Sequence, residues 1–243
     1  LGAGAGWYWL GDINVSTFED YFFGFYSLEA AAWDDIAYKK PYYLMIKAAG
    51  NDRNEGPAPG TTHFVMVNGN WVASNAVRSV DGIGGYDSTS HAGVSKNILA
   101  VGAVNDVVGG YSSPGGVVMS SFSSWGPADD GRIKPDVVGN GVGLWSATSS
   151  TNTAYTSLSG TSMASPNVTG SMGLLIQHYR TMHSGADMRS STLKAVVIHT
   201  ADECGSTTGP DYANGWGLVN TAKAAGVITL DQTEPGLIQE LAL

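Results

Sequence analysis

The 243-residue sequence has little cysteine, little charge and no long apolar run. Its single cysteine, Cys204, permits no internal disulfide and is most simply a small buried apolar side chain. No apolar stretch approaches the length of a membrane span. The 12 basic residues against 21 acidic ones give a formal charge of −9, which argues against a surface that binds phosphate backbones. We therefore expect neither a nucleic acid nor a membrane as a partner.

Glycine and apolar residues are plentiful by contrast. The sequence has 33 glycines and 43% hydrophobic residues, with only 14% charged residues. A chain of this length and hydrophobic content can bury a core as one large α/β domain or as two small ones. The glycines indicate many loops and many close backbone contacts.

The segment 160–166, Gly-Thr-Ser-Met-Ala-Ser-Pro, leads straight into an apolar pattern typical of an amphipathic helix. The apolar positions on the buried face are Val168, Met172, Leu175, Ile176 and Tyr179. We expect Pro166 in the first turn and Gly185 as the stop signal. Ser162 would then lie at the helix N-terminus, where free N–H groups and the helix dipole suit a forming oxyanion. The alternative is that Ser162 only caps the helix.

Two apolar segments predict buried strands. Residues 42–46, Tyr-Tyr-Leu-Met-Ile, run into Lys-Ala-Ala-Gly-Asn at 47–51, and residues 97–104 form a continuous apolar run that suits a sheet buried on both faces. At the carboxyl end of the first strand, the amide NH2 of Asn51 can donate a hydrogen bond. The alternative is that Asn51 simply turns the chain, because asparagine tolerates the left-handed conformation.

Two further helices are predicted from caps and periodicity. The first begins after a cap at Ser27 and ends near Lys40, and the second is capped by Ser191. The residues expected on their buried faces are Leu28, Ala31, Ala32 and Ile36 in the first, and Leu193, Val196 and Val197 in the second.

The other segments are less regular. The aromatic residues at 21–26 are interpreted as core, and at most a short strand is expected at 13–16. Residues 52–96 are interpreted as an irregular surface insertion with short β-like pieces at 63–67 and 71–73.

The segment 160–166 matches, residue for residue, the nucleophile motif of the subtilisin-like serine proteases, the subtilase family. The stretches 48–51, 97–104, 121–127, 131–138 and 215–225 resemble segments of the same family. The resemblance implies a three-layer α/β/α subtilisin-like fold with a mainly parallel sheet. It also implies Ser162 as the nucleophile and Asn51 as the oxyanion donor. Further substrate-binding residues implied by the match are Ala48, Ala49, Gly50, Gly160 and Thr161.

The sequence departs from the family pattern in two ways. After the Lys-Pro-Asp-Val stretch the family usually has Ala-Pro-Gly, whereas this chain has Gly-Asn-Gly at 139–141. The family also supplies its base histidine and orienting aspartate from Asp-Ser/Thr-Gly and His-Gly-Thr-His runs ahead of the oxyanion asparagine, and neither run occurs here. All the histidines follow Asn51: His63, His91, His178, His183 and His199. His91 is a tempting but weak candidate for the base, and the last three are interpreted as structural.

We therefore interpret the chain as a fragment, truncated at its N-terminal side, of a secreted serine endopeptidase that is inactive by itself. Residues 1–228 would be the C-terminal part of the peptidase domain, with 52–96 as a variable insertion. Residues 229–243 would be a linker and the start of a further domain. The expected partners are protein or peptide substrates and the missing N-terminal part of the same domain, and the expected state is a monomer.

No cofactor is expected. The histidines lack zinc spacing and no Asp-rich calcium loop is present, so no metal ligand is assigned, although the family often binds structural calcium. One alternative is a non-catalytic binding protein on the same fold. An acyl hydrolase with a nucleophile elbow is disfavoured, because Ala164 stands where that motif requires glycine.

Overall fold

The computed structural model describes residues 6–78, 83–89 and 91–240. Its elements are, in chain order, β1 (Tyr8–Trp9), α1 (Leu28–Lys39), β2 (Ile46–Ala48), β3 (His63–Val67), β4 (Asn70–Ser74), η1 (Ile83–Gly85), η2 (His91–Val94), β5 (Leu99–Val104), η3 (Pro114–Gly116), β6 (Val137–Asn140), β7 (Leu144–Ala147), β8 (Tyr155–Leu158), α2 (Thr161–Met182), α3 (Ser190–His199) and α4 (Thr221–Leu230).

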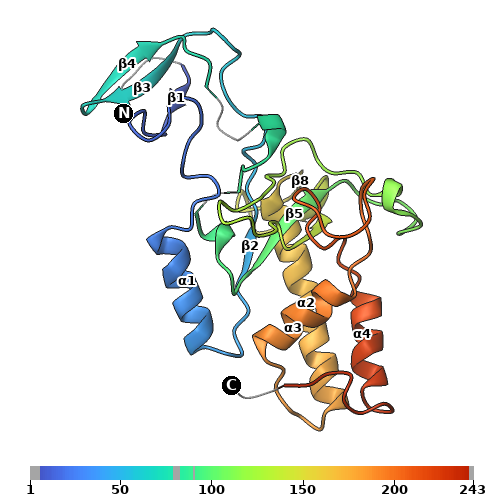
Figure 1. Ribbon diagram of the computed structural model, residues 1–243. Helices are drawn as coiled ribbons and strands as arrows, with labels where there is room; N and C mark the ends of the chain where they lie inside the picture. Colours follow the sequence, from blue (N-terminus) through green and yellow to red (C-terminus); the bar gives the residue numbers. More distant parts are fainter. Residues whose placement is uncertain (1–5, 79–82, 90, 241–243) are drawn as a thin grey trace.

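A parallel sheet of order β2-β5-β6 lies at the centre of the molecule. Every residue of β5 is buried, as its uninterrupted apolar sequence predicts for a strand covered on both faces. Helix α1 lies on one side of β2 and β5, and α2, α3 and α4 lie on the other (Figure 1). The arrangement is the predicted three-layer α/β fold with parallel strands.

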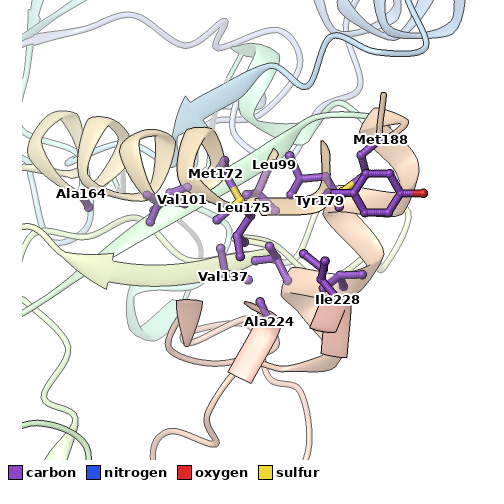
Figure 2. Packing of buried hydrophobic residues seen from close by; sticks show 14 of the residues in the cluster. Leu99, Val101, Val137, Ala164, Met172, Leu175, Tyr179, Met188, Ala224 and Ile228 are labelled. Carbon is purple, nitrogen blue, oxygen red and sulfur yellow. The ribbon is translucent and has the colours of Figure 1, made fainter. Parts of the chain in front are cut away.

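The main core forms where α2 packs on the sheet. Met172 and Leu175 of α2 lie against Leu99, Val101 and Val137 of the strands (Figure 2). Helices α3 and α4 close the same cluster from the far side through Leu193, Ala224 and Ile228. The predicted buried faces of α2 and α3 are thus confirmed, with Ile176 only partly buried. Fully burying a leucine-sized side chain contributes about 1.5–3 kcal/mol, so this cluster supplies much of the stability.

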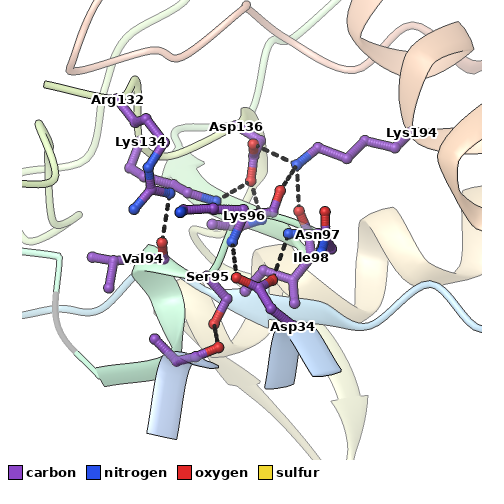
Figure 3. Close-up of polar contacts among 12 residues, drawn as sticks. Asp34, Val94, Ser95, Lys96, Asn97, Ile98, Arg132, Lys134, Asp136 and Lys194 are labelled. Carbon is purple, nitrogen blue, oxygen red and sulfur yellow. Dashed lines mark hydrogen bonds and ion pairs between the residues drawn. The ribbon is translucent and has the colours of Figure 1, made fainter. Parts of the chain in front are cut away.

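Buried charges join the layers beside the amino ends of β5 and β6 (Figure 3). The Asp136 carboxylate lies between two ammonium groups, 2.8 Å from Lys134 Nζ and 2.9 Å from Lys194 Nζ. It also accepts a hydrogen bond from the main-chain N–H of Ala100 at 2.7 Å. Lys194 comes from α3 and donates to the carbonyl of Ile98 at 2.6 Å. The network therefore ties α3 to both strands.

A second three-stranded sheet, of order β1-β3-β4, projects from the body of the molecule (Figure 1). Strands β3 and β4 form a hairpin at the β-like pieces predicted inside the insertion. The ring of Tyr8 stacks on Phe64 with centroids 5.1 Å apart, and Trp71 packs edge-on against Tyr8. The short strand expected at 13–16 is not present: the main-chain N–H groups of Val15 and Ser16 bond back to the carbonyl of Asp12 and make a turn instead.

Helix α1 has the predicted bounds but buries a different face. The Ser27 side chain caps it by accepting from the N–H of Ala30, as predicted. Its buried residues are Ala30, Asp34 and Ala37, whereas Leu28 is 90% exposed. The expected face, which also held Ile36, is therefore wrong. The reason is Asp34, whose carboxylate accepts bonds from Tyr26 and from the N–H groups of residues 96 and 97, and so turns a charged position inward.

Two aromatic predictions also fail. Phe22 and Phe25 are 41% and 42% exposed, so the segment 21–26 is a partly exposed aromatic patch and not core. The strand expected at 42–46 begins only at Ile46, because the chain turns first, with the N–H of Tyr43 bonded to the carbonyl of Lys40. Tyr42 and Tyr43 are consequently exposed.

The C-terminal helix is longer than expected. Asn220 caps α4 by accepting from the N–H of Lys223, and α4 runs on to Leu230, past the predicted start of a linker at 229. Residues 231–240 form turns and bends without a further helix or strand. They return to the domain, since Ile238 packs on the core and Glu240 accepts from the N–H of Arg189.

Candidate active site

Strand β2 delivers Asn51 to the carboxyl edge of the parallel sheet. The main-chain N–H of Ala49 extends the pairing with β5 by donating to Val101 at 3.0 Å. Gly50 then adopts a φ of +120°, a left-handed backbone that side chains disfavour, and the chain leaves the sheet. Asn51 follows with an exposed side chain. Ligand-binding groups in parallel α/β sheets collect at this edge.

Helix α2 delivers Ser162 to the same place. The helix is capped by Gly160 without a side-chain bond, and Ser162 is its second residue, with an exposed side chain. Ser162 therefore does not cap the helix, and the capping alternative is wrong. Pro166 lies at the sixth position and not in the first turn, so the prediction of its place is also wrong. Because proline has no N–H, the carbonyl of Ser162 has no i+4 donor within the helix.

Thr161 joins the two segments through the side chain of Asn51. The N–H and the hydroxyl of Thr161 each donate to Asn51 Oδ1 at 2.9 Å. A main-chain N–H can only donate, which fixes the carbonyl end of the amide on the Thr161 side. The Asn51 NH2 group is thereby left for another acceptor.

The space above Gly160 is bordered by two N–H donors. A Cβ placed on Gly160 would lie 3.6 Å from Asn51 Nδ2 and 3.6 Å from the main-chain nitrogen of Ser162. The two nitrogen atoms thus lie around one position beside Ser162, together with Met163 Sδ, and glycine leaves that position without a Cβ. An oxyanion-hole arrangement needs two such donors near the attacking hydroxyl.

The other residues predicted to contact a substrate differ in how exposed they are. Ala48 and Gly50 are partly exposed and remain candidates for substrate contact. Ala49 is 1% exposed and Thr161 is fully buried, so any contact of these two residues with a substrate stays a prediction. Thr161 holds Asn51. Gly160 is buried, and what it contributes is the missing Cβ.

A profile of the subtilase family matches residues 17–217. The chain belongs to this family. It is 33% identical over 208 residues to pyrolysin of Pyrococcus furiosus, an alignment that covers 81% of this chain and 13% of pyrolysin. It is 35% identical over 116 residues to the C5a peptidase of Streptococcus pyogenes, covering 45% of this chain and 10% of that protein. The chain thus spans only a small part of the curated relatives that it matches.

Solved structures support the same fold. The PatG macrocyclase in complex with peptide superposes with a TM-score of 0.54 at 21% identity, covering 82% of this chain and 47% of that one. The prenylagaramide maturation protease PagA superposes with a TM-score of 0.51 at 22% identity, covering 76% of this chain and 50% of that one. At these identities the likeness concerns the fold alone.

In this subtilase, Gly139 stands where the family pattern has alanine, and the packing at that position gives a reason. A Cβ on Gly139 would lie 2.8 Å from Cγ2 of Val168, because β6 lies close against α2 at that point. At Gly141, where the family pattern also has glycine, a Cβ would lie 2.6 Å from the Cβ of Ala103. The Gly-Asn-Gly sequence thus fits a close approach of strand and helix directly behind the candidate site.

Within the described ranges, no histidine of this subtilase hydrogen-bonds to Ser162. His178 pairs with Thr229 at 2.8 Å, and His183 pairs with Asp231 at 3.0 Å, which confirms their structural interpretation. His91 is mostly exposed and lies 3.9 Å from Glu29.

The ionisable groups give no sign of a bound metal. Among the described residues, no group of three or more His, Cys, Asp or Glu side chains is arranged to hold one.

Burial raises the pKa of Asp52, next to Asn51, above its ordinary value, while His91 and Lys47 act in the opposite direction. In the described part of the chain, no helix is both long and apolar enough to cross a bilayer.

The sequence did not predict the residues that hold the main chain next to Asn51 in place. Ser124 accepts from the N–H of Asp52, and Arg53 donates to the carbonyls of Ser120 and Ser123. The only signal in the sequence was the likeness of 121–127 to a family segment, which says nothing about what those residues touch.

Proposed function

We propose that this chain carries the nucleophile and an oxyanion donor of a serine endopeptidase that hydrolyses peptide bonds. Ser162 Oγ attacks the carbonyl carbon of the scissile bond while a base takes its proton. Collapse of the tetrahedral intermediate releases the amine and leaves an acyl-enzyme, which water then hydrolyses. The observation that carries the proposal is the pair of bonds from Thr161 to Asn51 Oδ1, which leaves the amide NH2 beside Ser162.

In this mechanism Asn51 donates to the oxyanion, with the main-chain N–H of Ser162 as the second donor. Loss of one such donor typically lowers the rate about 10²–10³-fold. Asn51→Ala is therefore expected to reduce kcat strongly and KM little, since the bond forms only as the charge develops.

The base histidine and its orienting aspartate are proposed to come from the segment that precedes Leu1 in the parent protein. Within the described residues β2 pairs only with β5, so its outer edge is available to a further strand. The matched relatives and solved structures are longer than this chain, which agrees with a domain completed elsewhere. Without the base, only a small residual rate enhancement is expected.

A fluorophosphonate probe, which reacts with activated serines, tests the proposal. The chain alone is expected to label negligibly at Ser162, and addition of the preceding segment, fused or in trans, is expected to restore labelling. Ser162→Ala should then abolish it, while Ser165→Ala, in the same motif, should leave it intact. Strong labelling of the chain alone would show that one of its own histidines acts as the base.

The second candidate function is a non-catalytic binding protein on the same fold. It is favoured only by the two missing sequence runs, and it predicts that the completed domain also fails to label. Secretion, a monomeric state, protein or peptide substrates, and a further domain in the parent protein remain part of the proposal. Sequencing the upstream coding region distinguishes the two candidates at once.

A further inference from the structure

The turn that carries Asn51 is held from two sides by buried side chains. On one side, Thr161 Oγ1 accepts from the N–H of Gly50 at 3.3 Å, in addition to its bond with Asn51. On the other side lies Ser124, which is fully buried and comes from a loop more than 70 residues away in sequence.

Ser124 contacts both neighbours of Asn51 in the chain. Its N–H donates to the carbonyl of Gly50 at 3.0 Å, and its Oγ accepts from the N–H of Asp52 at 3.1 Å. The approach is close, since a Cβ on Gly50 would lie only 2.6 Å from Ser124 Oγ. The hydroxyl of Ser124 therefore holds the peptide group between Asn51 and Asp52, and the main-chain N–H of Ser124 holds the peptide group between Gly50 and Asn51.

Arg53 anchors the same loop to the turn. Its Nε donates to the carbonyl of Ser123 at 3.0 Å, and a guanidinium nitrogen donates to the carbonyl of Ser120 at 2.6 Å. The guanidinium also stacks on Trp125, with its carbon 3.9 Å from the ring centroid. These contacts hold Ser124 at a fixed distance from Asp52.

We propose that Ser124 is a positioning residue that sets the direction of the Asn51 amide. Ser124 bonds to the peptide group before Asn51 and to the peptide group after it, so Asn51 is the only residue between the two contacts. If the contact with Asp52 is lost and Asp52 shifts, the side-chain amide of Asn51 rotates with the main chain about the Cα of Gly50. The position beside Ser162 tolerates little such movement, because a misplacement of about 1 Å can lower a rate about 10²-fold. The functional consequence rests on the proposed function, whereas the effect on the amide does not.

Ser123 provides a matched control. It is adjacent and also fully buried, and its Oγ accepts from the N–H of Ala103 in β5 at 3.0 Å. Each variant removes one hydroxyl that accepts from one main-chain N–H, that of Ala103 in Ser123→Ala and that of Asp52 in Ser124→Ala. The two variants are expected to lose similar stability, and only Ser124→Ala is expected to alter the Asn51 amide.

The first measurement is a ¹H–¹⁵N spectrum of the asparagine-labelled 243-residue chain, with the Asn51 side-chain signals assigned through Asn51→Ala. In Ser124→Ala the Asn51 NH2 signals should move toward those of a free exposed asparagine, and in Ser123→Ala they should stay in place. Arg53→Met, which leaves the serine itself intact, should move them in the same direction by less. Unmoved signals in both Ser124→Ala and Arg53→Met would overturn the proposal.

The second measurement is turnover of a peptide amide by the chain completed with its preceding segment. Ser124→Ala should lower kcat about 10-fold or more with KM within about two-fold, and Ser123→Ala should change neither. Equal kcat losses in the two serine variants would overturn the positioning role. If the completed wild type shows no turnover while the Asn51 signals still respond, the proposed function fails and the positioning of the amide stands.

Discussion

Because of Lys134, the free energy of unfolding of this chain is expected to change with pH in the alkaline range. Its side chain is 2% exposed, and its ammonium group lies 2.8 Å from the carboxylate of Asp136. Burial lowers the pKa of Lys134 from 10.5 to about 8, because desolvation outweighs the attraction of Asp136, while Lys194 and Arg132 lower it further. The perturbation we consider is Lys134→Met, which keeps the length of the side chain and removes the charge.

The sign follows from the protons that each state binds. Between pH 8 and 10.5 the unfolded chain keeps the Lys134 proton and the folded chain has lost it, so the free energy of unfolding rises with pH. A shift from 10.5 to about 8 corresponds to roughly 3 kcal/mol at about 1.4 kcal/mol for each pH unit. Below pH 8 both states are protonated and the unfavourable burial of the charge is present in full.

Urea unfolding followed by tryptophan fluorescence at pH 7, 8, 9 and 10 measures the effect. Lys134→Met should remove the upward slope that Lys134 contributes, so the wild type should gain stability relative to the variant by roughly 1–3 kcal/mol across this range. Asp136 keeps Lys194 and the N–H of Ala100 as partners in the variant, so the chain should still fold. Lys39→Met, at an exposed lysine, should leave the slope unchanged. Parallel curves for the wild type and Lys134→Met would refute the reasoning.

Four further substitutions, one of them a control, test the core and the candidate site. Leu175→Ala should destabilise the chain by about 2–5 kcal/mol, because the side chain is 1% exposed, whereas Leu174→Ala, at 63% exposure, should change the unfolding free energy by less than about 0.5 kcal/mol in urea melts. Thr161→Val removes one of the two donors to Asn51 Oδ1 and should slow probe labelling of the completed domain about 10-fold, with about 1–3 kcal/mol lost in thermal unfolding. Gly141→Ala should destabilise by about 1–3 kcal/mol in the same assay, because its Cβ would lie 2.8 Å from a main-chain oxygen at the start of α2.

The parts of the fold that the sequence predicts well are those set by one dominant force. Strand β5 is apolar at every position, and the buried face of α2 repeats apolar residues from Ala164 to Tyr179, so burial decides both without competition. Helix α1 shows the limit of that rule. Its most apolar positions lie in solvent because a carboxylate, Asp34, satisfies two main-chain N–H groups in the loop before β5. A periodicity argument has no means of seeing a bond to residues 62 and 63 positions away.

In the candidate site, too, the sequence predicts some residues and gives no sign of others. Ser162 and Asn51 were predictable because a residue pattern carries them, and the structure brings them together as expected. The role of Thr161 was not predictable, since the sequence favoured substrate contact and the structure buries it against Asn51. Ser124 carried no signal of its own, because its partners are main-chain groups that any sequence supplies.

The bonds that fix the Asn51 amide all come from residues of this chain. Thr161 orients the amide and Ser124 holds the flanking peptides, while Ser162 lies in the first turn of a helix anchored by the largest core cluster. None of these contacts requires a base. The two proposed oxyanion donors therefore already have fixed positions in this chain, so adding the proposed preceding segment should supply proton transfer without rearranging them. It follows that a completed domain whose base histidine is replaced should keep a small residual rate of peptide hydrolysis, and that Asn51→Ala should remove this residual rate. If the oxyanion donors took up their positions only when the base is present, the histidine variant would have no residual rate for Asn51→Ala to remove.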